Sequence, residues 1–279
     1  MNAVHGDLPR IGLIGAFTEY PDALTSMSRA AAALHALSSF GHVPGSGATL
    51  HDDIVELAAK SDVVICNAQD ERQFAELIAG IRGLAVTARS GLVVLDISGI
   101  SPVAFRDAAA ACKASGVRLC GAALHMRVTA EGGFLASADD ETFRDGRLMR
   151  ILETFSDEVH RVGGTGSSKA VAVIEGHLAA VSVAASAEAI RLGSAAGIPE
   201  GRLVPLLLNG SAANAVLRSG RLGDDGWRAP TLLSAWLKRS NDLCRAVRHP
   251  SWFGAVAADS LGRFSPFSAT RPALAGGAA

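Results

Sequence analysis

Short apolar runs alternate with helical patterns through the first half of the chain. Four of the runs have the length and composition of strands in a parallel sheet buried on both faces: residues 10–15, 62–66, 91–98 and 117–124. The helical patterns between them cover residues 22–41, 51–61, 73–81 and 101–116. This alternation predicts a doubly wound α/β sheet. Further strands over 134–139 and 158–163, with a helix over 142–156 between them, would complete it.

The pattern changes after residue 166. From about Ser167 to Ala196 there is no strand signal and no proline, which predicts one helix roughly 45 Å long at the standard rise per residue. The helix is apolar on most faces, so it must be buried, and a second copy of the chain is the expected cover. We therefore predict an α/β domain over 1–166, a helical dimerisation and substrate domain over 167–264, and a disordered tail over 265–279.

Composition and charge exclude several classes of partner. The chain has 279 residues, a formal net charge of −1 and no basic cluster, so nothing favours binding to nucleic acid or to an anionic membrane. We expect no signal peptide and no apolar run that spans a bilayer. The four cysteines form no CxxC pair and no cluster with histidine. They indicate buried, reduced thiols in a cytoplasmic protein, and no metal site.

Lysine is rare in this chain. Of the 26 basic residues only four are lysine, and the others are arginine, which cannot be deprotonated in practice. A lysine that is kept in such a background suggests that an exchangeable proton matters, because a lysine can be tuned toward neutrality. The four are Lys60, Lys113, Lys169 and Lys238.

Three motifs resemble the β-hydroxyacid dehydrogenase family, which includes 3-hydroxyisobutyrate dehydrogenases and is related to imine reductases. They are "DISGISP" at 96–102, "GGTGSSKAV" at 163–171 and "AWLKRS" at 235–240. The resemblance implies a Rossmann-like doubly wound parallel sheet followed by an all-α C-terminal domain with one long helix. It also implies that Lys169 is the catalytic lysine and that Lys238 lies near a nicotinamide.

The dinucleotide fingerprint departs from the family. Its three glycine positions hold Gly15, Phe17 and Tyr20, so a side chain is expected where the phosphates should pass, and Tyr20 should displace the helix or fill the groove. No second apolar strand is evident before residue 55, so we expect the sheet to lack one strand, together with the residue that reads the ribose. These departures predict that no cofactor binds. NADPH is the alternative, with Gly15 as its contact.

Other positions suggest a rebuilt substrate site. His125 replaces the family's carboxylate-binding serine at the end of a strand, and we expect it to face Lys169 across a cleft between the domains as a catalytic pair, because histidine is the usual acid or base near neutral pH. Glu175, in the long helix, is a weaker candidate. The expected contacts with a small-molecule substrate are listed last: Arg127, Ser98, His177 and Lys238.

Three functions remain open. The main expectation is a cofactor-independent acid/base enzyme of specialised biosynthesis, which would catalyse an isomerisation, cyclisation or dehydration in the cleft. The alternative is an NAD(P)H-dependent reductase of a small carbonyl or imine. The third is a non-catalytic binding or scaffold protein. All three predict a homodimer through residues 167–196.

Overall fold

The computed structural model describes residues 8–40, 47–127, 133–214, 217, 230–249 and 253–257, with the backbone alone at 40 and 230–236. The strands are β1 (Leu8–Gly15), β2 (Ala31–Leu37), β3 (Thr49–His51), β4 (Val63–Asn67), β5 (Val93–Asp96), β6 (Arg118–Met126), β7 (Phe134–Asp139) and β8 (Val159–Gly163). The helices are α1 (Pro21–Ala30), the 3₁₀ turn η1 (Ser38–Phe40), α2 (Ile54–Lys60), α3 (Glu71–Ala79), α4 (Leu84–Thr87), α5 (Pro102–Ala114), α6 (Asp140–Arg144), α7 (Gly146–Leu152), α8 (Ser167–Ala195), α9 (Glu200–Asn209) and α11 (Pro230–Ala246).

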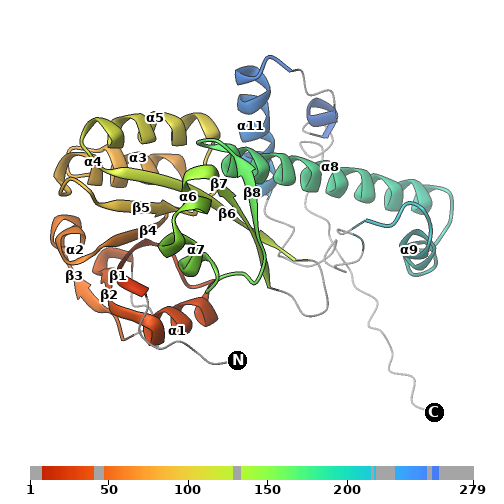
Figure 1. The fold of residues 1–279 in the computed structure, drawn as a ribbon. Helices are drawn as coiled ribbons and strands as arrows, with labels where there is room; N and C mark the ends of the chain where they lie inside the picture. Colours follow the sequence, from red (N-terminus) through yellow and green to blue (C-terminus); the bar gives the residue numbers. More distant parts are fainter. Residues whose placement is uncertain are drawn as a thin grey trace, which may run out of the picture. The chain divides into compact units, whose positions relative to one another are not determined.

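The eight strands form one sheet in the order β3-β2-β1-β4-β5-β6-β7-β8 (Figure 1). Neighbouring strands are parallel except β6 and β7, which are antiparallel. The order reverses at β1, which pairs with both β2 and β4. Open α/β sheets bind ligands at the carboxyl ends of the strands beside such a switch point. The predicted Rossmann-like fold followed by a long helix is confirmed, although the sheet is mixed and not wholly parallel.

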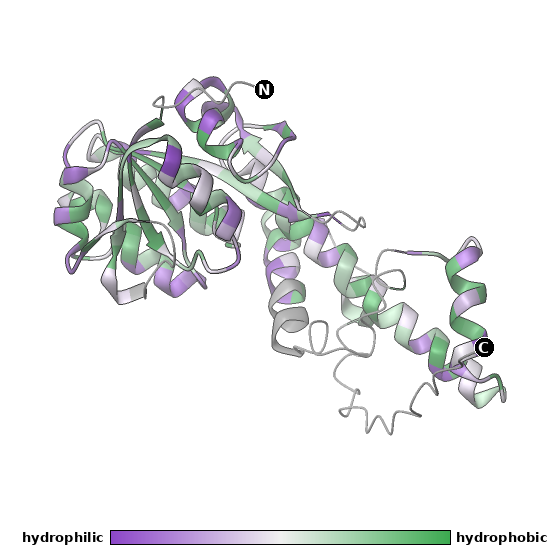
Figure 2. Cartoon of the chain, turned by 90° about the horizontal axis from the view of Figure 1, so that it is seen from below, coloured by the Kyte–Doolittle hydropathy of each residue, from purple (hydrophilic) through white to green (hydrophobic). Residues whose placement is uncertain are grey.

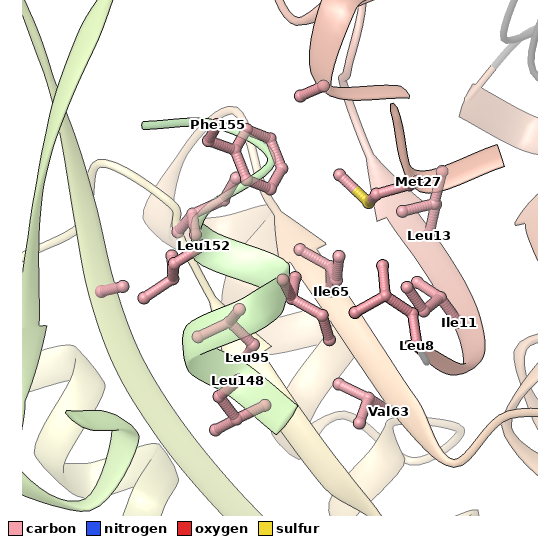
Figure 3. Packing of buried hydrophobic residues seen from close by; sticks show 14 of the residues in the cluster. Leu8, Ile11, Leu13, Met27, Val63, Ile65, Leu95, Leu148, Leu152 and Phe155 are labelled. Atoms are coloured by element: carbon pink, nitrogen blue, oxygen red, sulfur yellow. The ribbon is translucent and has the colours of Figure 1, made fainter. Parts of the chain in front are cut away.

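Helices cover both faces of the sheet. On one face α1 and α7 bury apolar side chains against β1, β4 and β5, and Figure 3 shows several of these side chains meeting: Met27, Leu148, Leu152, Ile11, Ile65 and Leu95. On the other face α2, α3 and α5 bury Leu57, Phe74 and Phe105. Because both faces of the central strands are covered, these strands are apolar at nearly every position, as their colour in Figure 2 shows.

The expectation that the sheet lacks a strand is wrong. The predicted helix over 22–41 is in fact the helix α1 followed at once by the strand β2, and the backbone becomes extended at Ala31, with φ −75° and ψ 143°. β2 pairs with β1 on one side and with β3 on the other. Alanine favours helices, but a strand held between two neighbours gains ladder hydrogen bonds and core contacts, and tertiary context overrides such propensities. Leu34 and Ala36 make those core contacts.

The chain divides into two compact units, Met1–Glu175 and Gly176–Ala279. The predicted long helix is confirmed as α8, whose 29 residues begin in the first unit and continue in the second. Within the second unit α8 packs against α11 and residues 253–257 through a small apolar cluster: Ala180, Val183, Ala184, Leu237 and Ala257. The predicted domain limits at 166 and 264 stay a prediction, and the predicted tail over 265–279 lies outside the described residues.

Helix α8 also bears on the membrane. Among the described helices it is the one with the length and composition to cross a bilayer, with a mean hydropathy of 1.6 in its most apolar stretch, and Figure 2 shows hydrophobic residues along most of it. The expectation that no run of the chain is long enough is therefore wrong. Its first turn, however, is part of the α/β core, because Lys169 is wholly buried there. A core helix passes the same test of length and composition.

Candidate functional site

The turn after β1 keeps the first glycine of the dinucleotide fingerprint for a structural reason. Gly15 has φ +107°, and a Cβ built there would lie 2.0 Å from the backbone oxygen of Asn67 in β4. The next residue, Ala16, donates its N–H to that same oxygen at 3.0 Å. A residue with a side chain would therefore meet both backbone strain and a clash, so this position requires glycine.

The two aromatic residues of the fingerprint point into the core. Phe17 is 3% exposed and belongs to the cluster that α1 and α7 bury on the sheet. The Tyr20 ring packs against Phe134 and Phe155, with centroids 5.2 and 5.4 Å apart, and burial raises the pKa of Tyr20 to about 12. The expectation that these side chains obstruct the phosphate path or fill the groove is therefore wrong, because the core accommodates them.

The turn keeps what a dinucleotide fingerprint needs at its first glycine, because Gly15 holds φ +107° between β1 and α1. The residues that could hold the pyrophosphate are Gly15 and the following turn up to the start of α1. Two features weaken this site relative to an ordinary fingerprint. Exposed Glu19 adds negative charge, and Pro21 at the first position of α1 has no N–H to offer an anion.

The carboxyl end of β2 has an acidic environment. The Ser38 hydroxyl, directly after β2, donates to the Asp52 carboxylate at 2.7 Å. Arg82 is paired with Asp53 at 2.8 Å. A shallow, open depression of about 260 Å³ lies beside these groups, and its lining residues are Leu37, Asp52, Asp53, Ile54, Glu76, Leu77 and Arg82. In dinucleotide-binding sheets this end of the second strand reads the adenosine ribose.

Lys169, in the first turn of α8, is enclosed by oxygen atoms. Its Nζ lies 2.7 Å from the Asp96 carboxylate and donates to the backbone oxygens of Asp96, Ser98 and Ala122 at 2.9, 3.1 and 2.7 Å. The side chain is 0% exposed. The ring of Phe105 lies 5.3 Å from the ammonium. These contacts use every donor of Lys169, so the structure does not bring it face to face with His125, and its catalytic role stays a prediction.

Ser98 belongs to the same buried network. Its hydroxyl donates to Asp96 at 2.5 Å and accepts the backbone N–H of Ala68 at 2.7 Å. The residue is 0% exposed, so its hydroxyl is not available to a substrate in this structure. Nearby Cys66 is also buried, and burial raises the pKa of its thiol well above the ordinary value.

His125, near the end of β6, has polar partners at both ring nitrogens. Nε2 lies 2.8 Å from the hydroxyl of Ser137 in β7, and Nδ1 contacts the carboxylate of Glu175 in α8. His125 is 9% exposed, whereas the side chain of Glu175 is 49% exposed. Ser137 was missed by the sequence reasoning, because it lies in an unremarkable strand and only the pairing of β6 with β7 brings it to the histidine.

The remaining candidates have other partners or are exposed. Arg127 is paired with Asp157 and Glu158 at 2.8 and 3.0 Å, so a substrate carboxylate would have to compete with both. In the second unit, His177 bonds Ser240 of α11 at 2.8 Å, which is a structural contact between two helices. Lys238 is exposed on α11. Substrate contact by these residues stays a prediction.

Asp139 explains the glycine-rich motif before α8. Its two carboxylate oxygens accept the backbone N–H groups of Gly166 and Ser168, each at 2.7 Å. These groups would otherwise be unpaired at the helix N-terminus. Gly121 gives the carboxylate room, because a Cβ there would lie 2.6 Å from it. The sequence signal was an aspartate at the end of a strand, but its partners lie 27 and 29 residues farther along the chain.

Metal ligands are not gathered in the described part of the chain. No group of three or more His, Cys, Asp or Glu side chains among those residues could hold a metal ion. The polar groups described at the carboxyl edge include the Gly15 turn, the Ser38–Asp52 pair, the enclosed Lys169 network and the set around His125.

Known proteins provide a further test of these observations. Residues 21–163 match the family model described as the NAD binding domain of 6-phosphogluconate dehydrogenase. L-threonate dehydrogenase from Escherichia coli O6:H1 is 27% identical over 176 residues, which are 61% of this chain and 57% of that protein. The match thus spans little more than half the length of this relative.

Solved structures show the same fold over nearly the whole chain. The 3-hydroxyisobutyrate dehydrogenase of Mycobacterium tuberculosis with L-serine has a TM-score of 0.73 at 18% identity and covers 92% of this chain and 93% of its own. Psf3 in complex with NADP+ and 2-OPP has a TM-score of 0.68 at 16% identity and covers 91% and 93%.

These matches overturn the expectation of a cofactor-independent acid/base enzyme. The matched family model is a NAD-binding domain, the matched L-threonate dehydrogenase is an oxidoreductase by name, and a protein of the same fold holds NADP+. The expectation failed because it read the fingerprint as obstructed and the sheet as incomplete, and the structure shows neither.

Proposed function

The chain belongs to the family of the NAD binding domain of 6-phosphogluconate dehydrogenase, within the β-hydroxyacid dehydrogenase group, and we propose that it is an NAD(P)-dependent oxidoreductase of a small hydroxy acid or of the corresponding oxo acid. The observation that carries this proposal is the match of residues 21–163 to a NAD-binding domain, and the positive-φ turn at Gly15 between β1 and α1 supports it. The dehydrogenase names of the matched relatives support the substrate class.

We assign the following roles in cofactor binding and catalysis to the residues of the site. When bound, the dinucleotide supplies or accepts the hydride. Gly15 and the turn after it would hold the pyrophosphate, and Ser38 and Asp52 would face the adenosine ribose. Lys169 would fix the backbone at the ends of β5 and β6, since it binds carbonyls of both. Among the groups described near the carboxyl edge, the imidazole of His125 would then be the one that exchanges a proton during the reaction.

We also propose that the protein is a cytoplasmic homodimer. Ile174, Leu178 and Leu192 are 58%, 65% and 70% exposed on α8, and their spacing places them on one face of the helix. A second copy would cover this apolar face. All four cysteines are free, which suits a reducing compartment.

Nucleotide binding tests the proposal directly. Titration of the full chain with NADH and NADPH, followed by nicotinamide fluorescence, should give a Kd tighter than about 100 μM for at least one of them. Turnover is then sought with L-threonate, L-serine and 3-hydroxyisobutyrate as probes. A protein that binds neither nucleotide even near 1 mM, where binding is worth only about 4 kcal/mol, would contradict the proposed function.

A further inference from the structure

A hydroxyl, an imidazole and a carboxylate form one continuous chain in the α/β unit. Ser137 of β7 lies 2.8 Å from Nε2 of His125, and Nδ1 of His125 contacts Glu175. The three side chains come from two adjacent antiparallel strands and from α8, so they meet only in the folded unit. Solvent exposure increases along this hydrogen-bonded series, from Ser137 at 3% to His125 at 9% and the Glu175 side chain at 49%.

The chemistry of the partners fixes the direction of each hydrogen bond. A carboxylate can only accept, so Nδ1 of His125 donates to Glu175. In the neutral ring Nε2 is then the acceptor, and it takes the O–H of Ser137. A serine hydroxyl can donate and accept at the same time, so the Ser137 oxygen can still take a proton from another group.

Lys169, the other candidate for this role, is enclosed. Its Nζ is surrounded by the Asp96 carboxylate and three backbone oxygens, and the side chain is 0% exposed. A proton released from that site would leave Asp96 as a buried, unpaired charge, which is costly. The set around His125 has no such restriction, because its outer end reaches solvent at Glu175.

We propose that Ser137, His125 and Glu175 are a proton relay that connects a buried substrate oxygen to solvent, and this rests on the oxidoreductase function proposed above. In the oxidation direction, the substrate hydroxyl gives its proton to the Ser137 oxygen as the Ser137 proton moves to Nε2. The Nδ1 proton moves to Glu175, which releases it to solvent, and the ring must return from the Nε2–H to the Nδ1–H tautomer before the next turnover. A bound dinucleotide would take the hydride, so one proton would leave for each hydride. Reduction runs the same path in reverse.

The relay assigns a separate task to each residue. Ser137 would be its catalytic end, the residue that the proposal places against the substrate oxygen. His125 and Glu175 act through Ser137. A buried inner end suits hydride chemistry, which is protected when water is excluded, and a half-exposed outer end allows exchange with solvent.

Two pairs of variants test the relay. Ser137→Ala removes the hydroxyl and should lower kcat/KM about 100-fold, as general acid–base groups typically contribute, whereas Ser137→Thr keeps a hydroxyl and should recover most of that loss. Glu175→Gln should lower kcat/KM about 10-fold or more and shift the acidic limb of its pH profile to lower pH, because the imidazolium loses its counter-charge. Glu153→Gln, which changes an exposed glutamate of the same unit, should leave the rate and the profile unchanged.

A readout independent of turnover is the ¹⁵N spectrum of the His125 ring. The relay requires the Nδ1–H tautomer in the wild-type chain and loss of that preference in Glu175→Leu, which removes the acceptor. An unchanged tautomer in Glu175→Leu, or equal turnover in Ser137→Ala and Ser137→Thr with equal melting temperatures, would overturn the relay. Failure of the wild-type chain to bind NADH or NADPH would instead refute the oxidoreductase function, and the ring spectrum would still decide whether Glu175 sets the state of His125.

Discussion

At the carboxyl edge of the sheet, the role of a single residue depends on the atoms of neighbouring strands that it contacts. Gly15 looks like the remnant of a lost motif, yet its φ of +107° and the backbone oxygen of Asn67 make it necessary for the fold itself. Lys169 looks like a catalytic group, yet in the structure it binds together the ends of two strands. Both have effects on stability that can be separated from their effects on activity.

Replacement of Gly15 should be far more costly than its backbone angle alone implies. Gly15→Ala combines positive φ with a Cβ 2.0 Å from the Asn67 oxygen. We expect a loss of at least about 2 kcal/mol, which lowers Tm by roughly 4 to 8 °C in a domain of this size. Gly91→Ala is the matched control, because φ there is +86° but no atom lies within 4 Å. Equal losses in the two variants, measured by thermal unfolding, would show that the close approach to Asn67 is unimportant.

The buried ion pair should show strong coupling. Lys169→Met leaves Asp96 buried without its partner, and breaking such a pair costs about 3–5 kcal/mol. Lys169→Arg should also be destabilising, since four oxygens enclose a compact ammonium and a guanidinium is larger. Adding Asp96→Asn to Lys169→Met should recover part of the loss in denaturant unfolding. If Lys169→Met is as stable as the wild type but inactive, the lysine is catalytic and not an anchor.

The sequence indicates which polar residues lie in the site more reliably than it indicates their hydrogen-bond and ion-pair partners. The scarcity of lysine drew attention to Lys169, and its place at the end of a strand drew attention to His125. Glu175 was named as a weaker candidate and Asp96 lies in a quoted motif, but neither pairing was predicted, because Asp96 lies 73 residues before Lys169 and Glu175 lies 50 residues after His125. The inward direction of Phe17 was equally hidden, since a fingerprint records which residue stands at a position and not where its side chain points.

At the scale of elements, β2 decides whether the fold is a complete dinucleotide-binding sheet. The strands that carry long apolar runs were predicted closely, as was the start of α5 at Ser101, whose hydroxyl accepts the N–H of Ala104 at 3.2 Å. β2 was not, because its alanine-rich sequence favours a helix locally and only its two neighbouring strands make it extended. Because β2 is present, the sheet has the strand end at which the adenosine ribose of a dinucleotide would be bound.

The environment of that place predicts a preference for NADH over NADPH. Asp52, Asp53 and Glu76 line the depression there, and the guanidinium groups described beside them are already paired, Arg82 with Asp53 and Arg72 with Glu76. A 2′-phosphate would bring about two more negative charges next to these carboxylates. We expect NADH to bind at least about 10-fold more tightly, a difference of about 1.4 kcal/mol.

Calorimetric titration with each nucleotide tests this preference. Asp52→Asn should narrow the difference in affinity, whereas Asp107→Asn, which removes the same charge from the exposed surface of α5, should leave it unchanged. Tighter binding of NADPH than of NADH by the wild-type chain would show that these carboxylates do not set the choice.

The edge of the sheet formed by β2 and β3 should lose stability in mild acid. Nδ1 of His35 lies 3.0 Å from Nε2 of His51, and the pKa of His35 is lowered by burial first and then by His51, Arg10 and Lys60. The folded protein therefore disfavours a proton that the unfolded chain binds below about pH 6.5. The stability contributed is present above that pH and is lost as the pH falls through it.

Thermal unfolding between about pH 7.5 and pH 5.5 measures this loss, across the range in which histidine changes charge. His35→Gln should lose less Tm over the range than the wild-type chain. His249→Gln, which changes an exposed histidine, should retain the wild-type dependence. An identical pH dependence in all three proteins would exclude His35 as the source.

At the scale of the whole molecule, α8 is the element that both units share. Ala180 and Ala184 are buried within the second unit against Leu237 and Ala257, so substitutions there would test internal packing. The exposed apolar face of α8 lies elsewhere on the helix, at Ile174, Leu178 and Leu192. That face is the part of α8 available to a second copy of the chain.

A charge on that face should separate the dimer. Leu178→Glu places a carboxylate where an apolar side chain is 65% exposed, and burying an unpaired charge at an interface is strongly unfavourable. Light scattering after size exclusion should show a dimer for the wild-type chain and a monomer for the variant. Val86→Glu, at a 64% exposed position of α4, should remain dimeric. A monomeric wild-type chain would rule out the proposed assembly.

The direct junction of α1 with β2 also has a consequence for how the chain folds. Helical turns form within about a microsecond, well before distant strands can pair, and the alanines of 30–33 would extend α1 in an isolated chain. β2 needs β1 and β3 before it gains anything from being extended. We therefore expect β2 to form after a transient helical extension of α1 has unwound, so that the strand whose end would read the ribose is among the last to become native.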